Sequence, residues 1–498
     1  MADYIKINPA DNVAVALHPL PKGMVALGVT LLQDVPQGHK FTLVDLVAGD
    51  NVIKYGYPIG HVTKDAPAGS WIDHSCIKTN LSGLLEYKYE PVAAVNAAAG
   101  RLWPFPAAAT FKGYRRADGQ IGIRNQIWVI PTVGCVNGIC EQIVSRFKAE
   151  QTKTDNVDAI VTFPHNYGCS QLGGDHENTR RVLADMVHHP NAGGVLVVSL
   201  GCENNQLDAF RELVGPVDEK RVKMFACQKV EDEIEYGVQC LREIYEASKS
   251  DVREDIPVSE LRVGLKCGGS DGLSGITANP LLGVFSDWLV AQGGTTVLTE
   301  VPEMFGAETI LMNRCQDEST FDQTVHLIND FKDYFMKQGM PVYENPSPGN
   351  KAGGISTLEE KSLGCTQKCG SSTVRGVLKY ADRLQKKGLN LLSAPGNDLV
   401  ASTALGASGC QMVLFTTGRG TPFGSFVPTM KISTNSQIAA LKPGWIDFNA
   451  GVLVEETSME QLAAEFRDYV LAVASGEPVN NEKHGIREIA IFKTGVTL

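Results

Sequence analysis

The chain has 498 residues, of which 43% are hydrophobic and 20% are charged. This composition excludes a disordered protein, and the length predicts two or three domains that can each bury a core. The formal net charge of −11 opposes nucleic-acid binding, which needs clustered Lys and Arg, so no nucleic-acid partner is expected.

The sequence also bears on the compartment. No apolar run approaches the roughly 18 residues of a membrane-spanning helix, and MADYIKINPADN lacks the basic start and apolar stretch of a secretory signal. We therefore expect a cytoplasmic protein without a membrane partner. There the 12 cysteines are expected to be buried thiols, metal ligands or catalytic groups, and not disulfides.

The first 90 residues contain short β-type runs separated by turn glycines, which predicts a small, mostly β domain. The clearest runs are 13–17, 41–44 and 51–54. His39 with Lys40, and Lys54 with Tyr55, stand beside turn glycines and suit an acid–base site. The alternative is that these side chains are simply solvated. Residues 91–111, rich in Ala and Pro, are predicted to be a linker.

From residue 112 onward, apolar runs of strand length alternate with amphipathic helical stretches, which is typical of parallel α/β layers. The runs are 127–130, 159–163, 194–200, 263–265, 296–299 and 412–416. A polar segment at 248–259 indicates a boundary. We therefore predict one α/β domain at 112–250 and a second at 258–498.

Four of these predicted strands end where glycine and cysteine are adjacent. The cysteines are Cys135, Cys169, Cys202 and Cys267. Because ligands collect at the carboxyl ends of parallel strands, we expect the four thiols to converge on one site. The alternative is that each thiol fills a crowded turn. His165, four residues before Cys169, adds an imidazole that could ligate a metal, shuttle protons or satisfy a turn.

Other polar segments could hold a substrate. CGGSDGLSGITANP places Ser270, Asp271 and Asn279 among glycines, a density of short polar side chains suited to hydroxyl groups, and EVPEMFGAE adds three carboxylates. Residues 344–371 are predicted to be a long functional loop, with Cys365 and Cys369 as a weak metal signal. Arg419, between two glycines, could clamp a carboxylate or form a surface salt bridge.

The motifs of the commonest nucleotide-binding proteins, zinc proteases and serine hydrolases are missing from the sequence. The sequence motifs that are present resemble those of the altronate/galactarate dehydratase family. The resemblance runs from YIKINPADNVAVAL to IFKTGVTL and so covers essentially the whole chain. The most specific of these words are GHKF, NVIKYGYPIG, GIRNQIWVIPTVGCVNG, HNYGCSQLG, GCENNQ, CGGSDGLSGITANP, EVPEMFGAE, NPSPGNKAGGI, SLGCTQK and GRGTPFG. Within the family, they fit the altronate branch better than the galactarate branch.

The resemblance implies an α/β protein with an N-terminal SAF-type β-clip domain and two α/β/α domains. It implies a hydro-lyase that converts a sugar acid, D-altronate, to 2-dehydro-3-deoxy-D-gluconate with the help of Fe2+ or Mn2+. The metal would acidify the C2 proton, while a base removes that proton and an acid assists loss of the 3-hydroxyl. We also expect a homo-oligomer, a dimer.

The positions that match the family motifs supply candidate residues for each role. For proton transfer we expect His39, Lys40, Lys54 and His165. For substrate binding we expect Arg124, Asn125, Ser270, Asp271, Asn279 and Arg419. For metal binding we expect Cys135, Cys169, Cys202, Cys267 and Cys365.

Several alternatives stay open. The substrate could be galactarate or another sugar acid, or the chain could bind a sugar acid without turnover, since SAF-type domains can serve in binding. Three or four of the strand-end cysteines could instead hold an iron–sulfur cluster whose open iron binds the leaving hydroxyl. Many relatives have a His-x-His-Asn run where this chain has Asp73, His74, Ser75 and Cys76, so if those histidines bind the metal in the relatives, this chain must use other groups.

Overall fold

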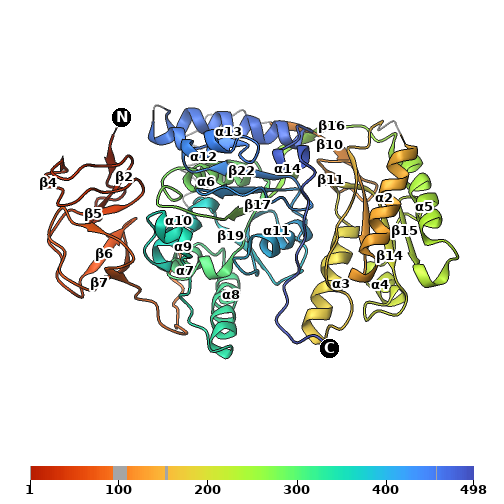
Figure 1. Ribbon diagram of the computed structural model, residues 1–498, viewed down its shortest axis with the longest axis horizontal. Coiled ribbons are helices and arrows are strands. Elements are labelled where there is room, and N and C mark those ends of the chain that lie inside the picture. The colour runs from red at the N-terminus through yellow and green to blue at the C-terminus, as the bar shows by residue number, and fades with distance from the viewer. Residues whose placement is uncertain (1, 93–108, 152–154, 456) are drawn as a thin grey trace.

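The computed structural model describes residues 2–92, 109–151, 155–455 and 457–498. It has three parts in a row: an N-terminal β domain, a large C-terminal α/β domain in the centre, and a smaller α/β domain on the far side (Figure 1). No described helix combines the length and the apolar character needed to cross a bilayer. The predicted α/β fold class with a small β domain is confirmed.

The N-terminal domain consists of short antiparallel strands, because turn glycines interrupt the chain every few residues. One sheet contains β1 (Tyr4–Ile5), β2 (Val13–Ala16), β5 (Lys40–Thr42) and β8 (Trp71–Ile72). A second contains β6 (Asn51–Lys54), β7 (Tyr57–Val62) and β9 (Ile77–Lys78), and β3 (Val25–Ala26) pairs with β4 (Val29–Thr30). Its apolar core includes Ala307 and Leu363 of the C-terminal domain, so the two domains are packed together.

A three-stranded antiparallel sheet stands where the chain enters and leaves the smaller α/β domain. It contains β11 (Ile121–Gly122), β10 (Thr110–Arg115) and β16 (Glu254–Pro257). β10 enters the domain and β16 leaves it, and the two are paired with Gly113 opposite Glu254. The predicted linker at 91–111 lies largely outside the described residues, because residues 93–108 are not described.

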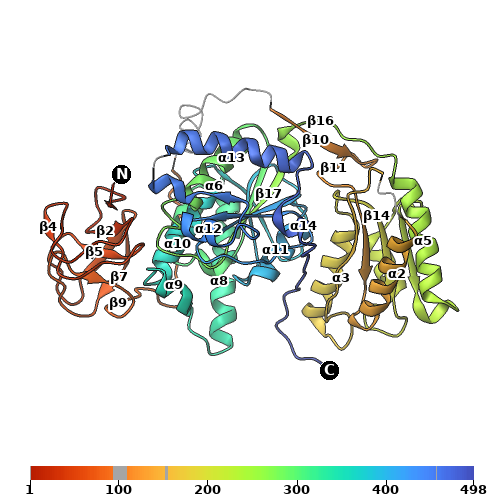
Figure 2. The ribbon, with the colours of Figure 1, turned by 45° about the horizontal axis from the view of Figure 1, so that its top comes forward.

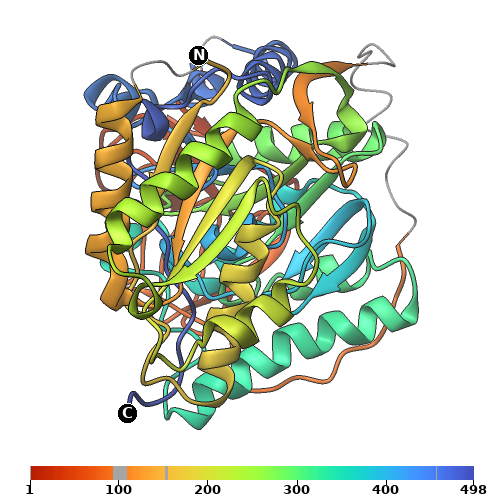
Figure 3. The ribbon, with the colours of Figure 1, turned by 90° about the vertical axis from the view of Figure 1, so that its right-hand side faces the viewer.

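The smaller α/β domain has one parallel sheet, in the order β13 (Ala159–Thr162), β12 (Gln126–Pro131), β14 (Ala192–Ser199) and β15 (Val222–Ala226). Helices α2 (Asn137–Glu150) and α5 (Glu233–Ser248) cover one face, and α3 (Gly173–Val187) and α4 (Leu207–Val214) cover the other (Figures 2 and 3). Burial on both faces explains why the central strands are almost entirely apolar.

The C-terminal domain is built on a seven-stranded parallel sheet. In spatial order it contains β19 (Val374–Leu378), β20 (Gly388–Leu392), β18 (Thr295–Leu298), β17 (Arg262–Cys267), β21 (Met412–Thr417), β22 (Thr429–Ser433) and β23 (Phe448–Asn449). Its longer helices are α6 (Ala278–Ala291), α8 (Glu318–Lys337), α11 (Asp398–Ala407) and α13 (Met459–Ala474). The shorter ones include α7 (Glu308–Met312), α12 (Ser436–Leu441) and α14 (Asn480–Lys483).

The prediction of a loop at 344–371 is wrong, because this segment contains α9 (Pro348–Ala352) and α10 (Leu358–Thr366). Ser347 caps α9 in a reciprocal pair with Asn350. Thr357 caps α10 by accepting a hydrogen bond from the backbone N–H of Glu360. The word Thr-x-x-Glu at 357–360 is a helix-start signal that the high density of Gly and Lys around it obscured.

Candidate active site

The carboxyl edge of the seven-stranded sheet meets the N-terminal domain. The strand order reverses at β17, which lies between β18 and β21, and ligands of open parallel sheets bind at such a switch point. The loop after β17 touches the N-terminal domain directly. A Cβ atom added to Gly272 would lie 1.9 Å from the carbonyl oxygen of Gly38, so the close contact requires glycine.

A cavity of about 370 Å³ lies at this junction. Its volume is typical of small-molecule sites, which range from about 300 to 1,000 Å³. Its walls include Gly38 of the N-terminal domain and Asp271, Arg419 and Asn435 of the C-terminal domain. A deeper chamber of about 10 Å³ shares Asp271 with the cavity. The polar side chains of the chamber are Lys54, Tyr55, Ser270, Asp271, Ser274, Asn279, Glu360, Lys361 and Cys365.

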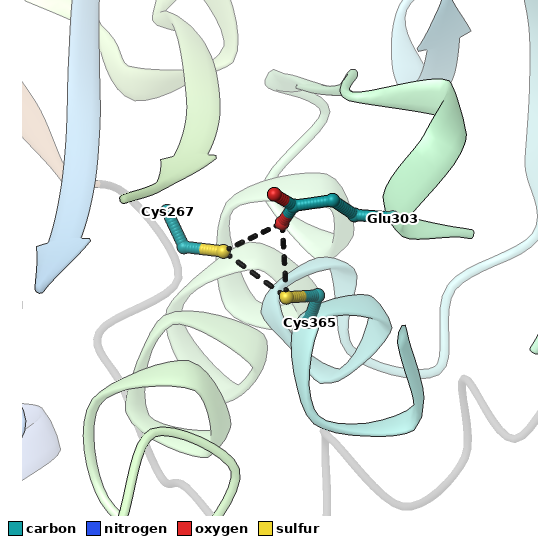
Figure 4. A group of neighbouring side chains, drawn as sticks. All are labelled: Cys267, Glu303 and Cys365. Carbon is teal, nitrogen blue, oxygen red and sulfur yellow. Dashed lines mark hydrogen bonds between the residues drawn. The ribbon is translucent and has the colours of Figure 1, made fainter. Parts of the chain in front are cut away.

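Two thiols and a carboxylate lie close together (Figure 4), and one of the thiols, that of Cys365, lines the chamber. Cys267 ends β17, Glu303 ends the 3-10 helix η4 (Val301–Glu303), and Cys365 lies on α10. Each sulfur is 3.2 Å from Oε2 of Glu303, and the two sulfurs are 3.1 Å apart. In the described part of the chain, this is the only group of three or more His, Cys, Asp or Glu whose donor atoms all lie within 4.8 Å.

The carboxylate of this group is held in its charged form by lysines. The Nζ of Lys361 donates to Oε1 of Glu303 at 2.7 Å. Burial opposes the charge on Glu303, but Lys361, Lys266 and Lys368 outweigh it and lower its pKa to about 2. The hydrogen bond with Cys267, together with burial, raises the pKa of the Cys365 thiol well above its usual value. Cys365 therefore keeps its proton at neutral pH unless a cation replaces it.

Two thiols and a carboxylate are donors that could hold a divalent cation. Of the two metals expected from the sequence, Mn2+ prefers carboxylate, carbonyl and water oxygen, so the two thiols suit Mn2+ less well than Fe2+. Three buried lysines around the group, Lys266, Lys361 and Lys368, form ion pairs with three carboxylates. The formal charges of these six side chains therefore add up to zero. The carboxylates are Glu300, Glu303 and Asp398. Exchanging two thiol protons for one divalent cation keeps that sum at zero, so the cost of burying charge does not rise.

A buried ion-pair cluster joins the N-terminal domain to α10. Lys40 and Lys54 both donate to the carboxylate of Glu360, at distances from 2.8 to 3.0 Å. Burial raises the pKa of a carboxyl, but the two lysines lower that of Glu360 to about 2. Burial also lowers the pKa of Lys40, whereas the pKa of Lys54 is raised because Glu360 and Tyr55 outweigh its burial. The cluster carries a net charge of +1 beside the chamber.

His39 lies at the same junction as a neutral imidazole. Trp71 Nε1 donates to Nδ1 of His39 at 3.2 Å, and Nε2 lies 3.3 Å from the carbonyl oxygen of Ala352. Because an indole N–H can only donate, the ring proton is on Nε2. Burial lowers the pKa of His39. Both ring nitrogens are therefore occupied in this conformation.

Asp271 is the carboxylate that lines both the cavity and the chamber. It accepts hydrogen bonds from Thr434 Oγ1 at 2.9 Å and from Asn435 Nδ2 at 3.0 Å. Burial raises its pKa, although these donors oppose the shift. Arg419 is exposed at the cavity wall, and no ion-pair partner for it is found among residues 2–92, 109–151, 155–455 and 457–498.

Two further predicted substrate ligands line the chamber and have partners there. Asn279 donates to the carbonyl oxygen of Gly364 at 3.0 Å and accepts from Thr416 Oγ1 at 2.7 Å. Ser270 Oγ lies 3.5 Å from the sulfur of Cys267. The structure thus brings together the predicted residues His39, Lys40, Lys54, Cys267, Ser270, Asp271, Asn279, Cys365 and Arg419.

Three residues predicted for substrate binding or proton transfer lie outside this junction. Arg124 binds both carboxylate oxygens of Glu482, at 2.8 and 2.7 Å, and its other N–H groups donate to backbone carbonyls. Asn125 donates to the carbonyl oxygens of Asn156 and Ser248. His165 is buried against the carbonyl oxygen of Pro131, at 2.8 Å from Nε2, and burial lowers its pKa. None of the three lines the cavity or the chamber.

The expectation that four strand-end cysteines converge on one site is wrong. Cys267 ends a strand of the seven-stranded sheet and is buried, whereas the other three follow strands of the four-stranded sheet and are exposed. These three are Cys135, Cys169 and Cys202. The apolar runs look alike in the sequence, and nothing local in them indicates which sheet a strand joins.

Comparison with known proteins covers the chain almost completely. Three family models match: the altronate/galactarate dehydratase SAF domain at residues 2–80, the second domain of D-galactarate dehydratase/altronate hydrolase at 113–249, and the C-terminal domain of D-galactarate/altronate dehydratase at 258–497.

Curated relatives match over the same length. The chain is 57% identical to altronate dehydratase of Bacillus subtilis (strain 168), with 100% of both chains covered. It is 56% identical to altronate dehydratase of Escherichia coli (strain K12), covering 99% of this chain and 100% of the relative. It is 34% identical to galactarate dehydratase (L-threo-forming) of Escherichia coli (strain K12), covering 99% and 97%.

Proposed function

Because the chain belongs to the altronate/galactarate dehydratase family, we propose that it removes water from D-altronate and leaves 2-dehydro-3-deoxy-D-gluconate. The structural observation that carries this proposal is the buried group of Cys267, Glu303 and Cys365, since Cys365 lines a small chamber that shares Asp271 with a cavity of small-molecule size. The higher identity to altronate dehydratases than to a galactarate dehydratase favours altronate as the substrate.

Cys267, Glu303 and Cys365 would hold the divalent ion, which we propose is Fe2+. When bound, the ion would supply Lewis-acid polarisation of the substrate oxygens, which makes the C2 proton more acidic. The remaining chemistry belongs to side chains of the cavity and the chamber.

Positive charge draws the anionic substrate inward. Arg419 at the cavity wall attracts the carboxylate of the substrate, and the Lys40, Lys54 and Glu360 cluster keeps a net charge of +1 at the chamber. Asn435 and Ser270 offer short polar groups to the substrate hydroxyls. We propose that these contacts hold the substrate in the cavity with its reacting carbons against Asp271, which lines both the cavity and the chamber.

Asp271 would act as the base that removes the C2 proton. Its raised pKa brings it closer to neutral pH than an ordinary aspartate, which improves a general base. Lys361 would protonate the leaving 3-hydroxyl. Burial opposes its charge, but Glu303 and the nearby thiols raise the pKa of Lys361 above its usual value, so this side chain is protonated at neutral pH. We propose that His39, whose ring nitrogens are occupied, positions the cavity wall through Ala352.

The substrate panel tests the overall function. Protein loaded with Fe2+ under reducing conditions is incubated with aldonates and aldarates, and the 2-keto-3-deoxy product is measured. We expect D-altronate to give the highest kcat/KM. Turnover of galactarate without turnover of altronate would move the chain to the galactarate branch. Binding of altronate without any product would indicate a sugar-acid-binding protein.

Asp271→Asn tests the proposed base. It should lower kcat by about 10² to 10⁴-fold, the usual contribution of general acid–base catalysis, with little change in KM. In the wild-type enzyme, kcat should rise with pH as Asp271 loses its proton. Because burial raises its pKa, this rise should occur above the usual range of an aspartate.

A second variant provides the control for this assignment. Thr434→Val removes a hydrogen bond that favours the charged form of Asp271, so the rise in kcat should shift to higher pH. A pH profile that is unchanged in Thr434→Val, together with normal turnover in Asp271→Asn, would exclude Asp271 as the base.

A further inference from the structure

Three exposed cysteines lie outside the proposed active site. Cys135 follows β12, Cys169 follows β13 and Cys202 follows β14, so all three stand at the carboxyl edge of the four-stranded sheet. The other nine cysteines of the chain are buried or half-buried. Cysteine is among the most buried residue types, so three exposed thiols on adjacent loops indicate a ligand. The smaller α/β domain and the N-terminal domain lie on opposite sides of the C-terminal domain (Figures 1 and 2).

The three loops are bonded to one another. The backbone N–H of Gly134 donates to the carbonyl oxygen of Tyr167 at 3.0 Å, and that of Asn205 donates to the carbonyl oxygen of Gly168 at 3.0 Å. A Cβ atom on Gly168 would lie 2.1 Å from the carbonyl oxygen of Thr132. A glycine precedes each of the three cysteines, so the backbones can pack closely while the thiols remain at the surface.

The surroundings of these thiols include hydrogen-bond donors, and one nearby carboxylate already has its own partners. Glu203 is buried, and its carboxylate already accepts from Ser199 Oγ, Thr132 Oγ1 and two backbone N–H groups at 2.6 to 3.1 Å. Gln171 is 5% exposed, and its Oε1 accepts from the backbone N–H of Gly168. Its buried Nε2 has no hydrogen-bond partner in the described part of the chain, which leaves a donor beside the Cys169 loop.

We propose that Cys135, Cys169 and Cys202 bind an iron–sulfur cluster of the [4Fe–4S] type, in which the fourth iron has no cysteine ligand. A single tetrahedral ion with bonds of about 2.3 Å would need sulfurs about 3.8 Å apart. The three sulfurs do not all lie within 4.8 Å of one another, since the only described group that does is the one at Cys267. A cluster spreads its thiolates farther apart because each binds a different iron.

The neighbouring backbone suits an anionic cluster of this kind. α2 begins two residues after Cys135, and α3 begins four residues after Cys169. Helix N-termini present free N–H groups to negative groups, and hydrogen bonds to sulfur stabilise such clusters. The loops 163–174 carry amide and hydroxyl side chains and no Lys, Arg, Asp or Glu. Binding releases three thiol protons to solvent as three Fe–S bonds form. The open iron would accept an oxygen ligand such as a hydroxyl or a carboxylate.

Anaerobic reconstitution of the full chain with ferric iron, sulfide and dithiothreitol tests the proposal. The wild-type protein should gain visible charge-transfer absorption and about four iron and four sulfide per chain, beyond the iron held elsewhere. The variant Cys135→Ser/Cys169→Ser/Cys202→Ser should gain neither. Cys240→Ala, which removes a buried thiol of α5 in the same domain, should remain like the wild type.

Two further measurements separate this site from the proposed active site and from misfolding. Cys267→Ser/Cys365→Ser should keep the visible absorption. Iodoacetamide should modify the three exposed cysteines before reconstitution and not after it, as mapped by mass spectrometry. Because these thiols are exposed, the triple variant should keep the wild-type circular dichroism and melting temperature. A colourless wild-type protein after reconstitution, or an equally coloured triple variant, would overturn the proposal, whatever the altronate assay shows.

Discussion

Glu303→Gln should bind Fe2+ much more weakly and should lower kcat/KM for the sugar acid by about a thousandfold, which is about 4 kcal/mol of transition-state stabilisation. The amide is a weaker ligand than the carboxylate that stands 3.2 Å from both thiols. The substitution also leaves the ammonium group of Lys361 without the carboxylate that it binds at 2.7 Å. Metal content by elemental analysis and steady-state kinetics measure the two effects separately.

A matched variant controls for general damage to the core. Cys315→Ser changes another buried thiol of the same domain that lies outside the group at Glu303, so iron content and turnover should stay near wild type. Full iron content in Glu303→Gln would remove this carboxylate from the metal site. Full turnover by rigorously demetallated wild-type protein would remove the metal from the reaction.

Glu360→Gln should lower the free energy of unfolding by about 3–5 kcal/mol, the usual cost of breaking a buried ion pair by removing one partner. The substitution leaves Lys40 and Lys54 buried without the carboxylate that both of them bind. Because these lysines belong to the N-terminal domain and Glu360 to α10, that domain should dissociate first. Thermal denaturation and limited proteolysis of the N-terminal domain measure the change.

The adjacent residue offers a control with the same chemical substitution. Glu359 is also buried, but its carboxylate accepts from neutral donors, among them Thr79 Oγ1 and the backbone N–H of Asn80. Glu359→Gln leaves no lysine unpaired, so it should cost clearly less stability than Glu360→Gln. Equal losses in the two variants would mean that the ion pairs are not what holds the domains together.

The carboxylate of Glu360 also makes the stability of the fold depend on pH in the acid range. Its pKa falls from about 4.5 to about 2 in the folded chain. Because the pKa of this carboxyl is lower in the folded chain than in the unfolded chain, its charged form stabilises the fold at every pH above about 4.5. This stabilisation is lost as the pH falls from about 4.5 to about 2. A shift of this size is worth at most about 3 kcal/mol. Glu360→Gln should therefore lose less stability than the wild type over this range.

The sequence allowed prediction of the layered fold because parallel strands buried on both faces are continuous apolar runs, as in β12, β14, β17 and β21. It also allowed prediction that Cys267, Asp271 and Asn279 belong to the site. These three residues lie within 13 positions of one another at and after the end of β17, so they are close in space whatever the rest of the fold. The motifs thus located much of the candidate site without any knowledge of its geometry.

The contacts that could not be predicted join distant parts of the chain. Glu360 meets Lys40 across 320 residues and Lys54 across 306 residues, and neither local composition nor periodicity indicates such a pair. The sequence showed Glu303 as one of three carboxylates in EVPEMFGAE and did not indicate which of them meets the thiols. That depends on how η4 packs against α10, which brings Glu303 next to Cys365. The division of the cysteines between two sheets has the same cause, since strand pairing is set by tertiary packing.

The pairing of β10 with β16 makes the smaller α/β domain an insertion whose two ends are neighbours. Adjacent antiparallel strands can be closed by a turn of as few as two residues, so a shortened chain could join Gly113 to Glu254 without stretching either strand. The module with the exposed thiols could therefore be lost, gained or exchanged as a unit, while the sheet with the cavity keeps its own connections.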